Sequence, residues 1–320
     1  MSFVIINPVG ISSHVHHHPA LRNVVIKSLI RNGTRQQVAE IQHDDDTAYL
    51  KCYLGTYAAQ RHKAACARLR QAADIMSGEN QVVRPLLELV DCHTLIMSPA
   101  PGLPMRDACV TADTQRRLAI VRRAGEWLAC LITAREQRPF FAWKWHQKLV
   151  EFASTFQSDE TVDATLVGQH LVHMEQVTRR LHVREVCHGV SHGDFHSENI
   201  FVAEDGDRLI LTGIDMETAE PIPVVKDLAR MLVWLQIDAE PGSDRESGID
   251  RSLFDNLCAP HGPFAAADRL ALHFHIGEML LEFYLRRGAR VPEIRRKMSL
   301  AIEHWMSSCA AILRDCQGVD

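Results

Sequence analysis

The sequence lacks the features that mark membrane, secreted and repeat proteins. No apolar run approaches the ~18 residues needed to cross a bilayer, and the stretch from Ile120 to Ile132, for example, is interrupted by charged residues. The first residues, MSFVIINPVG, have no basic segment ahead of an apolar run, so they do not resemble a secretion signal. No internal repeat or low-complexity tract occurs. We therefore expect no membrane span and a cytoplasmic location.

An excess of positive charge and paired cysteines are also missing. The net charge is −5, which argues against non-specific binding to nucleic acid. Nine cysteines occur without a C-x-x-C pair or regular spacing, a usage typical of reduced thiols in the cytosol. Apolar residues make up 46% and charged residues 23% of the 320 residues, which is an ordinary globular composition. A chain of this length is expected to form two lobes.

The stretch HGDFHSENIF, from His192 to Phe201, carries the clearest chemical signal. It places Asp194 and Asn199 in the pattern H-x-D-x-x-x-x-N. Phosphoryl transfer needs a carboxylate that orients and deprotonates the attacking hydroxyl, and an amide oxygen that helps to hold Mg²⁺ on the phosphates. The spacing is that of the catalytic loop of protein kinases, with Gly193 where those enzymes usually carry Arg. Asp194 and Asn199 are therefore candidates for these two groups.

Two β-rich runs follow the loop, Ile200 to Ala203 and Arg208 to Ile214, and the sequence Glu-Asp-Gly-Asp separates them. Asp-Gly between apolar runs is the strongest short-range signal for a β-hairpin. Antiparallel strands would return Asp215 to within a few residues of Asn199 at the open end of the hairpin. Local geometry alone would then bring together two oxygen ligands for a hard cation.

Two alternatives to phosphoryl transfer remain open for this loop, a metal site and plain loop structure. His192, Asp194 and His196 fit a hydrolase pattern, H-x-D-x-H, but zinc sites of that kind need further ligands, and no second cluster has a ligand-like order. A His-Gly-Asp turn by itself is also common loop structure. The Asn, the hairpin and the second Asp favour phosphoryl transfer over both. A further group of histidines would bind a transition metal or form a polar loop: His14, His16, His17 and His18.

The segments HGDFHSEN, IDMETAE and KDLARML resemble those of the aminoglycoside phosphotransferase and choline kinase family. These are small-molecule kinases with the protein-kinase-like fold. The resemblance implies a two-lobed α+β fold, with a small N-lobe built on an antiparallel sheet, a mainly helical C-lobe, and ATP and Mg²⁺ bound at the lobe interface. It implies that Asp194 is the catalytic base, that Asn199 and Asp215 are metal ligands, and that Asp227 braces the catalytic loop.

The start of the chain matches a kinase N-lobe. Three consecutive hairpin strands are expected, Val24 to Arg31, Gln36 to His43 and Ala48 to Leu54. The turn Asn32-Gly33-Thr34 falls where kinases carry the loop that covers the phosphates. Lys51 lies in the third strand, where kinases place the Lys that pairs with the nucleotide phosphates. We expect these four residues to contact ATP.

The helix expected from Tyr57 to Ala73 departs from the family. A kinase helix at this position normally supplies a Glu that pairs with the strand Lys. Here no acidic residue occurs before Asp74, which leaves Lys51 without an obvious partner. The candidates to replace the missing Glu are Gln60, His62 and Glu88.

Residues 98–102, Ser-Pro-Ala-Pro-Gly, have the composition of a hinge. The expected organisation is an N-lobe over residues 1–97 and a C-lobe over residues 103–320 that holds the catalytic loop and the substrate site. In the family the hinge backbone hydrogen-bonds the adenine, and the residues implied are Met97, Ser98 and Ala100.

Two segments of the C-lobe concern packing and substrate. Thr114 to Ala134 has helical periodicity, with Asp113 as the expected N-cap. Pro139 to Trp145 is aromatic, and such a run is either core packing or a box for a quaternary ammonium group.

The charge of the carboxy-terminal helices bears on the acceptor. Between Asp250 and Leu300 the chain has six acidic and eight basic residues. A pocket for polycationic aminoglycosides needs an excess of carboxylates, because each buried amine needs a paired anion. We therefore expect a neutral or anionic hydroxyl compound.

The sequence thus predicts an ATP- and Mg²⁺-dependent phosphotransferase that moves the γ-phosphoryl group to a hydroxyl of a small molecule. One alternative is a kinase of lipopolysaccharide core sugars, which shares the fold. The other is a degenerate, nucleotide-binding interaction protein, which the missing helix Glu favours and the intact Asp194, Asn199 and Asp215 oppose. The acceptor, the choice between ATP and GTP, and the oligomeric state stay open.

Overall fold

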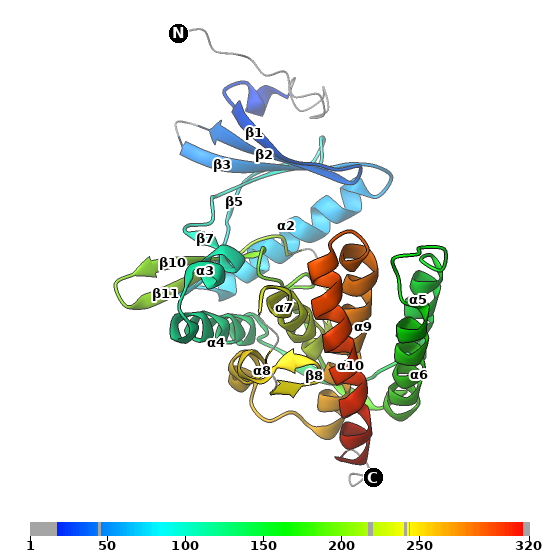
Figure 1. The fold of residues 1–320 in the computed structure, drawn as a ribbon. Helices are drawn as coiled ribbons and strands as arrows, with labels where there is room; N and C mark the ends of the chain where they lie inside the picture. The colour runs from blue at the N-terminus through cyan, green and yellow to red at the C-terminus, as the bar shows by residue number, and fades with distance from the viewer. Residues whose placement is uncertain (1–17, 44–45, 217–219, 240–241, 243, 316–320) are drawn as a thin grey trace. The chain divides into compact units, whose positions relative to one another are not determined.

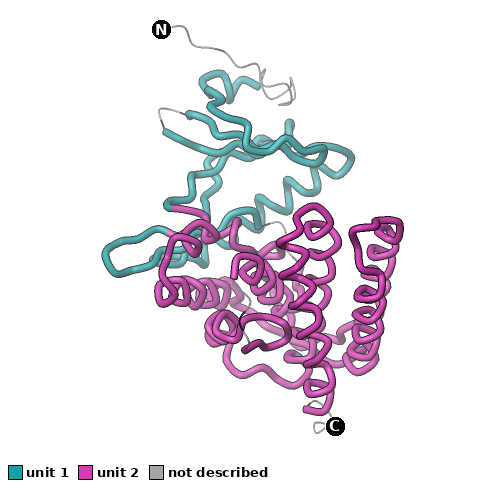
Figure 2. Tube along the Cα trace, viewed as in Figure 1, with its two compact units in different colours: residues 1–102, 203–219 teal, residues 103–202, 220–320 magenta. Residues whose placement is uncertain are grey.

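The computed structural model describes residues 18–43, 46–216, 220–239, 242 and 244–315. Within them the chain has a mixed α+β fold with an antiparallel amino-terminal sheet and a helical carboxy-terminal part (Figure 1), so the predicted fold class is confirmed. The chain divides into unit 1, residues 1–102 and 203–219, and unit 2, residues 103–202 and 220–320 (Figure 2). In the described ranges, no helix combines the length and the apolar character needed to cross a membrane.

Unit 1 contains an antiparallel five-stranded sheet with the strand order β1-β2-β3-β6-β5. The strands are β1 (Val25–Asn32), β2 (Gln36–His43), β3 (Asp46–Tyr53), β5 (Pro85–Leu89) and β6 (Thr94–Met97), and a short 3₁₀ turn, η1 (Pro19–Leu21), precedes them. The first three strands confirm the predicted hairpins, and Gln36 lies opposite Tyr53 in the central pair.

Alternation along β3 decides which way its side chains point. Leu50 and Cys52 are buried in an apolar cluster with Leu21 on one face of the sheet. Because successive side chains of a strand point to opposite faces, Lys51 and Tyr53 lie on the other face. There Tyr53 packs against the first turns of helix α2 (Ala58–Ile75). The strand therefore presents Lys51 on the side that α2 covers.

The sequence of α2 explains both its helical structure and its close packing. It is rich in Ala, Arg and Gln, which are good helix formers. Its buried side chains recur every three or four residues, as expected for one apolar stripe on a helix, and they include Ala58, His62, Ala65, Leu69 and Ala72. None of these five is a carboxylate.

A short strand after α2 explains why residues 203–219 belong to unit 1. β4 (Asn80–Val82) pairs in parallel with β11 (Arg208–Gly213), with Leu211 opposite Asn80. Together with β10 (Ile200–Asp205), β11 forms the expected hairpin. The division between the units crosses β10, so the hairpin starts in unit 2 and ends in unit 1.

Unit 2 is mainly helical. Its helices are α3 (Met105–Thr111), α4 (Thr114–Leu131), α5 (Ala142–Ser154), α6 (Ala164–Leu181), α7 (Val224–Asp238), α8 (Arg251–Cys258), α9 (Ala266–Phe283) and α10 (Pro292–Asp315), with the 3₁₀ turn η2 (Ala259–His261) and the π-helical segment η3 (Tyr284–Gly288). Short strands connect them: β7 (Leu103–Pro104), β8 (Arg135–Pro139), β9 (Glu185–Gly189), β12 (Ile222–Pro223), β13 (Arg245–Glu246) and β14 (Ile249–Asp250).

Helix α7 lies at the centre of unit 2. All its residues are buried except Lys226, Arg230 and Asp238, which is the pattern of a helix surrounded by other elements. Lys226 and Arg230 are four residues apart and therefore share one face of α7.

A close contact between α9 and α10 involves Gly277. A Cβ at this position would lie 2.5 Å from the Trp305 ring and 2.7 Å from the sulfur of Met174. Trp305 is fully buried and donates its Nε1–H to the carbonyl of His273 at 2.8 Å. Neither the ring nor its hydrogen bond leaves room for a methyl group.

Gly277→Ala should therefore destabilise the protein by about 1–3 kcal/mol through overpacking, although Ala is the better helix former by about 1 kcal/mol. Gly168 of α6 is the matched control, because a Cβ there meets no atom within 4 Å, and Gly168→Ala should stabilise by about 0.5–1 kcal/mol. Denaturant unfolding of both variants measures the two free energies. Equal effects of the two substitutions would contradict the packing described at Gly277.

Candidate functional site

Unit 2 holds the HGDFHSEN loop between β9 and β10, and a buried carboxylate of α7 anchors it. Asp227 Oδ2 accepts hydrogen bonds from Ser191 Oγ at 2.5 Å and from the Gly193 N–H at 2.8 Å. Gly193 has a φ of +87°, a conformation that favours glycine. The bracing role expected for Asp227 is confirmed by these two contacts.

Aromatic packing fixes the same loop from the other side. Phe195 is fully buried and its ring stacks on that of Trp127 in α4, with centroids 5.8 Å apart. His192 packs against both rings. Because Phe195 points into the core, its neighbour Asp194 keeps a side chain that is 42% exposed.

Asp194 lies among polar groups that hold its carboxylate. Arg230 Nη1 donates to Oδ1 at 2.8 Å. Asn199 donates its Nδ2 to the main-chain carbonyl of Asp194 at 2.9 Å and to Oδ2 at 3.3 Å. His196 Nε2 lies 3.5 Å from Oδ2. The carboxylate is therefore fixed in direction by three side chains.

These neighbours also set the ionisation of Asp194. Burial by itself would raise its pKa, but the hydrogen bond from His196 and the charge of Arg230 lower the pKa to about 2. Asp194 is thus ionised throughout the neutral range. A carboxylate of this kind is a weak base that can accept a hydrogen bond from a hydroxyl group.

His196 has its own support. The Glu198 N–H donates to Nδ1 of His196 at 3.3 Å, so the ring proton is on Nε2 and faces Asp194. The imidazole stacks on Trp234 of α7, with centroids 4.1 Å apart and planes 7° from parallel. His196 is therefore a hydrogen-bond donor to Asp194.

The described residues do not bring three zinc ligands together at this loop. Among the described residues, a single group of three or more His, Cys, Asp or Glu places its ligand atoms within 4.8 Å of one another, and it is His18, Asp91 and Cys92 in unit 1. Even there the tautomer is unsuitable, because the Ala20 N–H donates to Nδ1 of His18 and the ring proton then lies on Nε2, facing Asp91. The other histidines of the amino-terminal group, His14, His16 and His17, lie outside the described residues.

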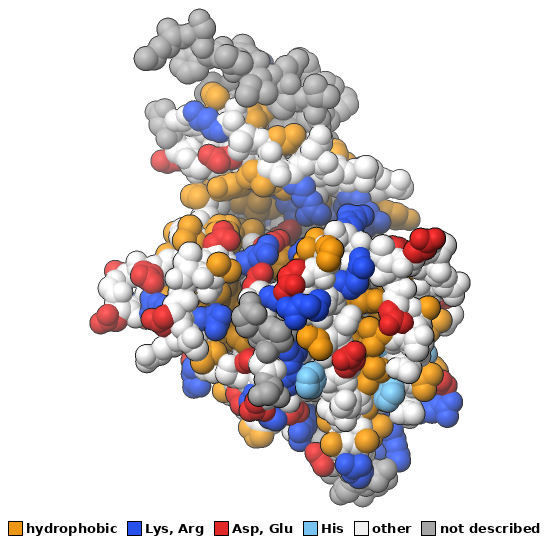
Figure 3. Space-filling view, viewed as in Figure 1, with side chains coloured by type: hydrophobic (Ala, Val, Ile, Leu, Met, Phe, Trp, Pro, Cys, Tyr) orange, Lys and Arg blue, Asp and Glu red, His pale blue; other side chains and the backbone are white. Residues whose placement is uncertain are grey.

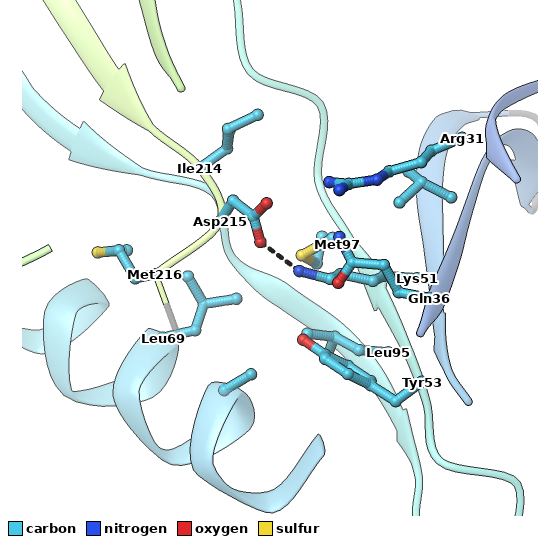
Figure 4. Close-up of a pocket in the computed structure, with 12 residues that line it drawn as sticks. Arg31, Gln36, Lys51, Tyr53, Leu69, Leu95, Met97, Ile214, Asp215 and Met216 are labelled. Atoms are coloured by element: carbon cyan, nitrogen blue, oxygen red, sulfur yellow. Dashed lines mark hydrogen bonds and ion pairs between the residues drawn. The ribbon is translucent and has the colours of Figure 1, made fainter. Parts of the chain in front are cut away.

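Unit 1 contains a pocket with a Lys–Asp ion pair inside it (Figure 4). Lys51 Nζ donates to Asp215 Oδ1, and the Tyr53 ring centroid lies 5.1 Å from Nζ. Asp215 follows β11 and has a φ of +61°, a conformation that Asp tolerates better than most residues. The cavity volume of this pocket is about 90 Å³, which is smaller than most small-molecule sites.

The acidic partner missing from α2 is not replaced by the three candidates from the sequence. His62 is bonded to the carbonyl of Thr94 at 3.1 Å, and Glu88 pairs with Arg70. Gln60 lines a different pocket, together with Thr34. The α2 residues that line the pocket of Lys51 are Ala65 and Leu69. Asp215 holds Lys51 instead.

The turn between β1 and β2 contributes to this pocket through its flanking residues. The Gly33 N–H donates to the carbonyl of Gln36 at 3.0 Å and closes the turn, while the side chain of Asn32 accepts from Gln37 at 2.8 Å. Asn32, Gly33 and Thr34 do not line the pocket, whereas Arg31 and Gln36 do. Figure 4 shows the guanidinium of Arg31 extending from β1 towards Asp215.

The predicted hinge segment contributes one side chain to the same pocket. Two of its main-chain groups make no hydrogen bond with a described residue. Met97, at the end of β6, lines the pocket. The Ser98 N–H donates a hydrogen bond to the carbonyl of Arg84 at 2.9 Å. The carbonyl of Ser98 and the N–H of Ala100 make no hydrogen bond with a described residue. Neither Ser98 nor Ala100 lines the pocket of Lys51, and Ser98 lines a separate pocket with Pro99.

The donors expected for a metal ion suit a hard cation. Asn199 is buried and commits its amide nitrogen to Asp194, so its oxygen, Oδ1, has no hydrogen-bond partner among the described residues. Asp215 supplies a carboxylate. Amide and carboxylate oxygens are the ligands that Mg²⁺ prefers, so the chemistry of these donors fits the predicted ion.

The sequence analysis did not identify two residues of these sites. Arg230 reaches Asp194 across 36 positions of the chain, and Arg31 lies in an exposed-looking strand pattern. For Arg230 a signal exists, since it follows Asp227 by three positions on a helix whose start braces the loop.

The comparisons with known proteins agree with this geometry. The model of the family described as "Phosphotransferase enzyme family" matches residues 28–256, a span that contains Lys51, Asp194, Asn199 and Asp215. No curated protein matches the chain in sequence.

Solved structures share the fold at low sequence identity. A microcompartment-associated aminopropanol kinase has a TM-score of 0.56 and 15% identity, covering 95% of this chain and 96% of its own. A choline/ethanolamine kinase family protein from Mesorhizobium loti has a TM-score of 0.55 and 14% identity, covering 94% and 92%. A thermostable mutant of the aminoglycoside phosphotransferase APH(4)-Ia, in a ternary complex with ADP and hygromycin B, has a TM-score of 0.53 and 14% identity, covering 91% and 94%.

The family match spans most of the chain and includes the loop, the strand Lys and the hairpin Asp described above. The chain belongs to the phosphotransferase enzyme family that includes the aminoglycoside phosphotransferases.

Proposed function

We propose that this protein transfers the γ-phosphoryl group of ATP to a hydroxyl group of a small molecule, in a reaction that depends on Mg²⁺. The observation that carries the proposal is the fixed, ionised carboxylate of Asp194, held by Arg230, Asn199 and His196. Such a group is suited to orient a hydroxyl nucleophile. The fold neighbour solved with ADP and hygromycin B supports a nucleotide and a small acceptor as the two substrates.

The nucleotide would be held mainly by unit 1. Lys51 and Arg31 would bind the phosphates, and Ser98 and Ala100 would pair with the base through their free main-chain groups. Asn199 and Asp215 would hold Mg²⁺, which neutralises phosphate charge when bound. Asn32, Gly33 and Thr34 stay predicted contacts through the turn that they form.

Asp194 would act on the acceptor alone. Its carboxylate accepts a hydrogen bond from the attacking hydroxyl, and Arg230 keeps it in the direction that the hydroxyl must approach. The proton passes to Oδ2 of Asp194 as the oxygen bonds to phosphorus, and ADP leaves. Most of the rate acceleration then comes from positioning and from neutralising charge.

A neutral or anionic acceptor is expected from the charges of unit 2. Over the part of unit 2 where α7, α9 and α10 are drawn, Figure 3 shows Lys and Arg side chains mixed with Asp and Glu rather than an acidic patch. The carboxylates of this region are paired with cations, for example Glu282 with Arg286 and Glu293 with Arg296. A polycationic acceptor would find few free carboxylates. Cytoplasmic location stays a prediction.

One observation favours a second candidate, a nucleotide-binding protein without turnover. Lys51 is held by Asp215, which is itself the proposed metal ligand, and α2 contributes no carboxylate to the lining of this pocket that could release Lys51. Binding of ATP with no transfer to any acceptor would support this alternative. A kinase of lipopolysaccharide core sugars is a special case of the main proposal.

The release of ADP tests the proposal. The purified protein is incubated with Mg²⁺ and ATP over a panel of alcohols, sugars, hydroxy acids and antibiotics. We expect one chemical class to raise the rate of ADP release well above the rate without acceptor, and to do so only with Mg²⁺. Tight ATP binding together with an acceptor-independent rate over the whole panel would instead favour the second candidate.

A further inference from the structure

The partly exposed face of α7 beside Asp194 carries two cations. Arg230 holds the carboxylate of Asp194, and Lys226 lies one helical turn before it. These are the only residues in the first two turns of α7 that are not buried. Any acceptor whose hydroxyl reaches Asp194 therefore meets this face of the helix.

Two carboxylates of α9 near this face are held by other partners. Glu278 of α9 is bonded to Nδ1 of His275 at 2.8 Å, and Glu282 pairs with Arg286 at 3.1 Å. Both remain close enough to influence the charge of Lys226. Neither makes a direct ion pair with it.

Lys226 has no ionic partner in the part of the chain that the structure describes. Its Nζ makes no hydrogen bond or ion pair with a described residue and lies 3.9 Å from the centroid of the Trp145 ring. Burial lowers the pKa of Lys226, although Glu278 opposes this effect. Nε of Arg230 is also buried without a hydrogen-bond partner. Two cations with unused donors cost free energy that a bound anion would offset.

The contact with Trp145 also bears on whether this ring can bind a cationic acceptor. A box for a quaternary ammonium group needs a free ring face. The ring of Trp145 is covered by Lys226 and stacks with Phe140, with centroids 6.5 Å apart. A cationic acceptor would have to displace a cation of the protein and would approach Arg230 as well.

We propose that Lys226 and Arg230 form an anion-binding subsite, so that the acceptor is a hydroxyl compound carrying a carboxylate or phosphate group. The part of this inference that concerns the acceptor of the reaction rests on the proposed function. It makes Lys226 a determinant of specificity, with Asp194 placed to receive the hydroxyl of the molecule whose anion the two cations bind.

Four probes with the same three-carbon skeleton separate the charges. Glycerate and glycerol 3-phosphate carry a carboxylate and a phosphate, glycerol is neutral, and 3-aminopropane-1,2-diol is cationic. ADP release at limiting acceptor should be faster with at least one of the anions than with glycerol, and slowest with the amine. Lys226→Met should lower kcat/KM for the preferred anion by about tenfold to a hundredfold, with little effect on glycerol.

Two variants sharpen this test. Lys226→Glu should move the preference from the anion to the amine. Lys148→Met is the matched control, because Lys148 lies 5.5 Å from the same Trp145 ring but is exposed, and it should keep the anion preference. An amine that outperforms both anions in the unmodified protein, or a Lys226→Met variant with unchanged preference, would overturn the proposal.

A binding measurement makes the result independent of turnover. Acetylation of lysines, read by mass spectrometry, should be slowed at Lys226 by one of the anions and not by glycerol, with Lys148 as the internal reference. Protection of Lys226 without phosphoryl transfer would uphold the anion site and count against the proposed function. Phosphoryl transfer without protection of Lys226 by either anion would uphold the proposed function and count against the anion site.

Discussion

Asp194→Asn should lower kcat by about 10²–10⁴ while the affinity for the nucleotide changes little. The amide keeps the shape of the side chain but cannot accept the proton of the hydroxyl. It also loses the charged partner of Arg230, which lies 2.8 Å away in the native protein. Rates of ADP release at saturating acceptor measure kcat, and calorimetry with ATP measures the affinity.

A neighbouring residue provides the control for this substitution. Glu198 lies in the same loop, is 43% exposed and faces Arg106 at 3.4 Å. Glu198→Gln should therefore leave kcat within a few-fold of the native value, as exposed ion pairs contribute little. Near-native turnover in Asp194→Asn would remove Asp194 from the mechanism.

Asp215→Ala should abolish the dependence of ATP binding on Mg²⁺. The side chain is the carboxylate that ends the hairpin, and its removal leaves Lys51 without the partner that orients it. Titration of ATP with and without Mg²⁺ should give the same weak affinity in the variant and different affinities in the native protein. The exposed turn residue Asp207 is the control, and Asp207→Ala should keep the response to Mg²⁺.

The expected loss has one competing explanation to exclude. Glu217, the nearest other carboxylate after Asp215 in the sequence, lies outside the described residues. A double substitution of Asp215 and Glu217 shows whether it substitutes as a ligand. Unchanged affinity for ATP with Mg²⁺ in the double variant would refute the assignment of Asp215.

Local sequence predicted most of the framework of the sites. The three strands of unit 1, the hairpin after Asn199 and the N-cap of α4 all follow from turn residues and capping chemistry. Asp113 indeed accepts a hydrogen bond from the Arg116 N–H at 2.8 Å. Bracing of the HGDFHSEN loop by Asp227 followed from the family resemblance. Each of these depends on short stretches whose residue types strongly prefer one conformation.

The contacts that tune the sites were not predictable in the same way. Lys51 and Asp215 are 164 positions apart, whereas the partners that the sequence suggested for Lys51 were Gln60, His62 and Glu88. Lys226 covers Trp145 from a different helix, which no periodicity in the aromatic segment indicates. Such pairs depend on tertiary packing. A pattern in one sequence does not show which of several candidate residues a side chain contacts.

The most direct test of the central claim follows the phosphoryl group itself. ATP labelled at the γ-phosphorus is incubated with the protein, Mg²⁺ and the best acceptor from the panel, and the products are separated. The proposed function predicts label on a hydroxyl oxygen of the acceptor, in an amount equal to the ADP formed, and almost none with Asp194→Asn. Label found only in inorganic phosphate, or an equal yield from the variant, would contradict it.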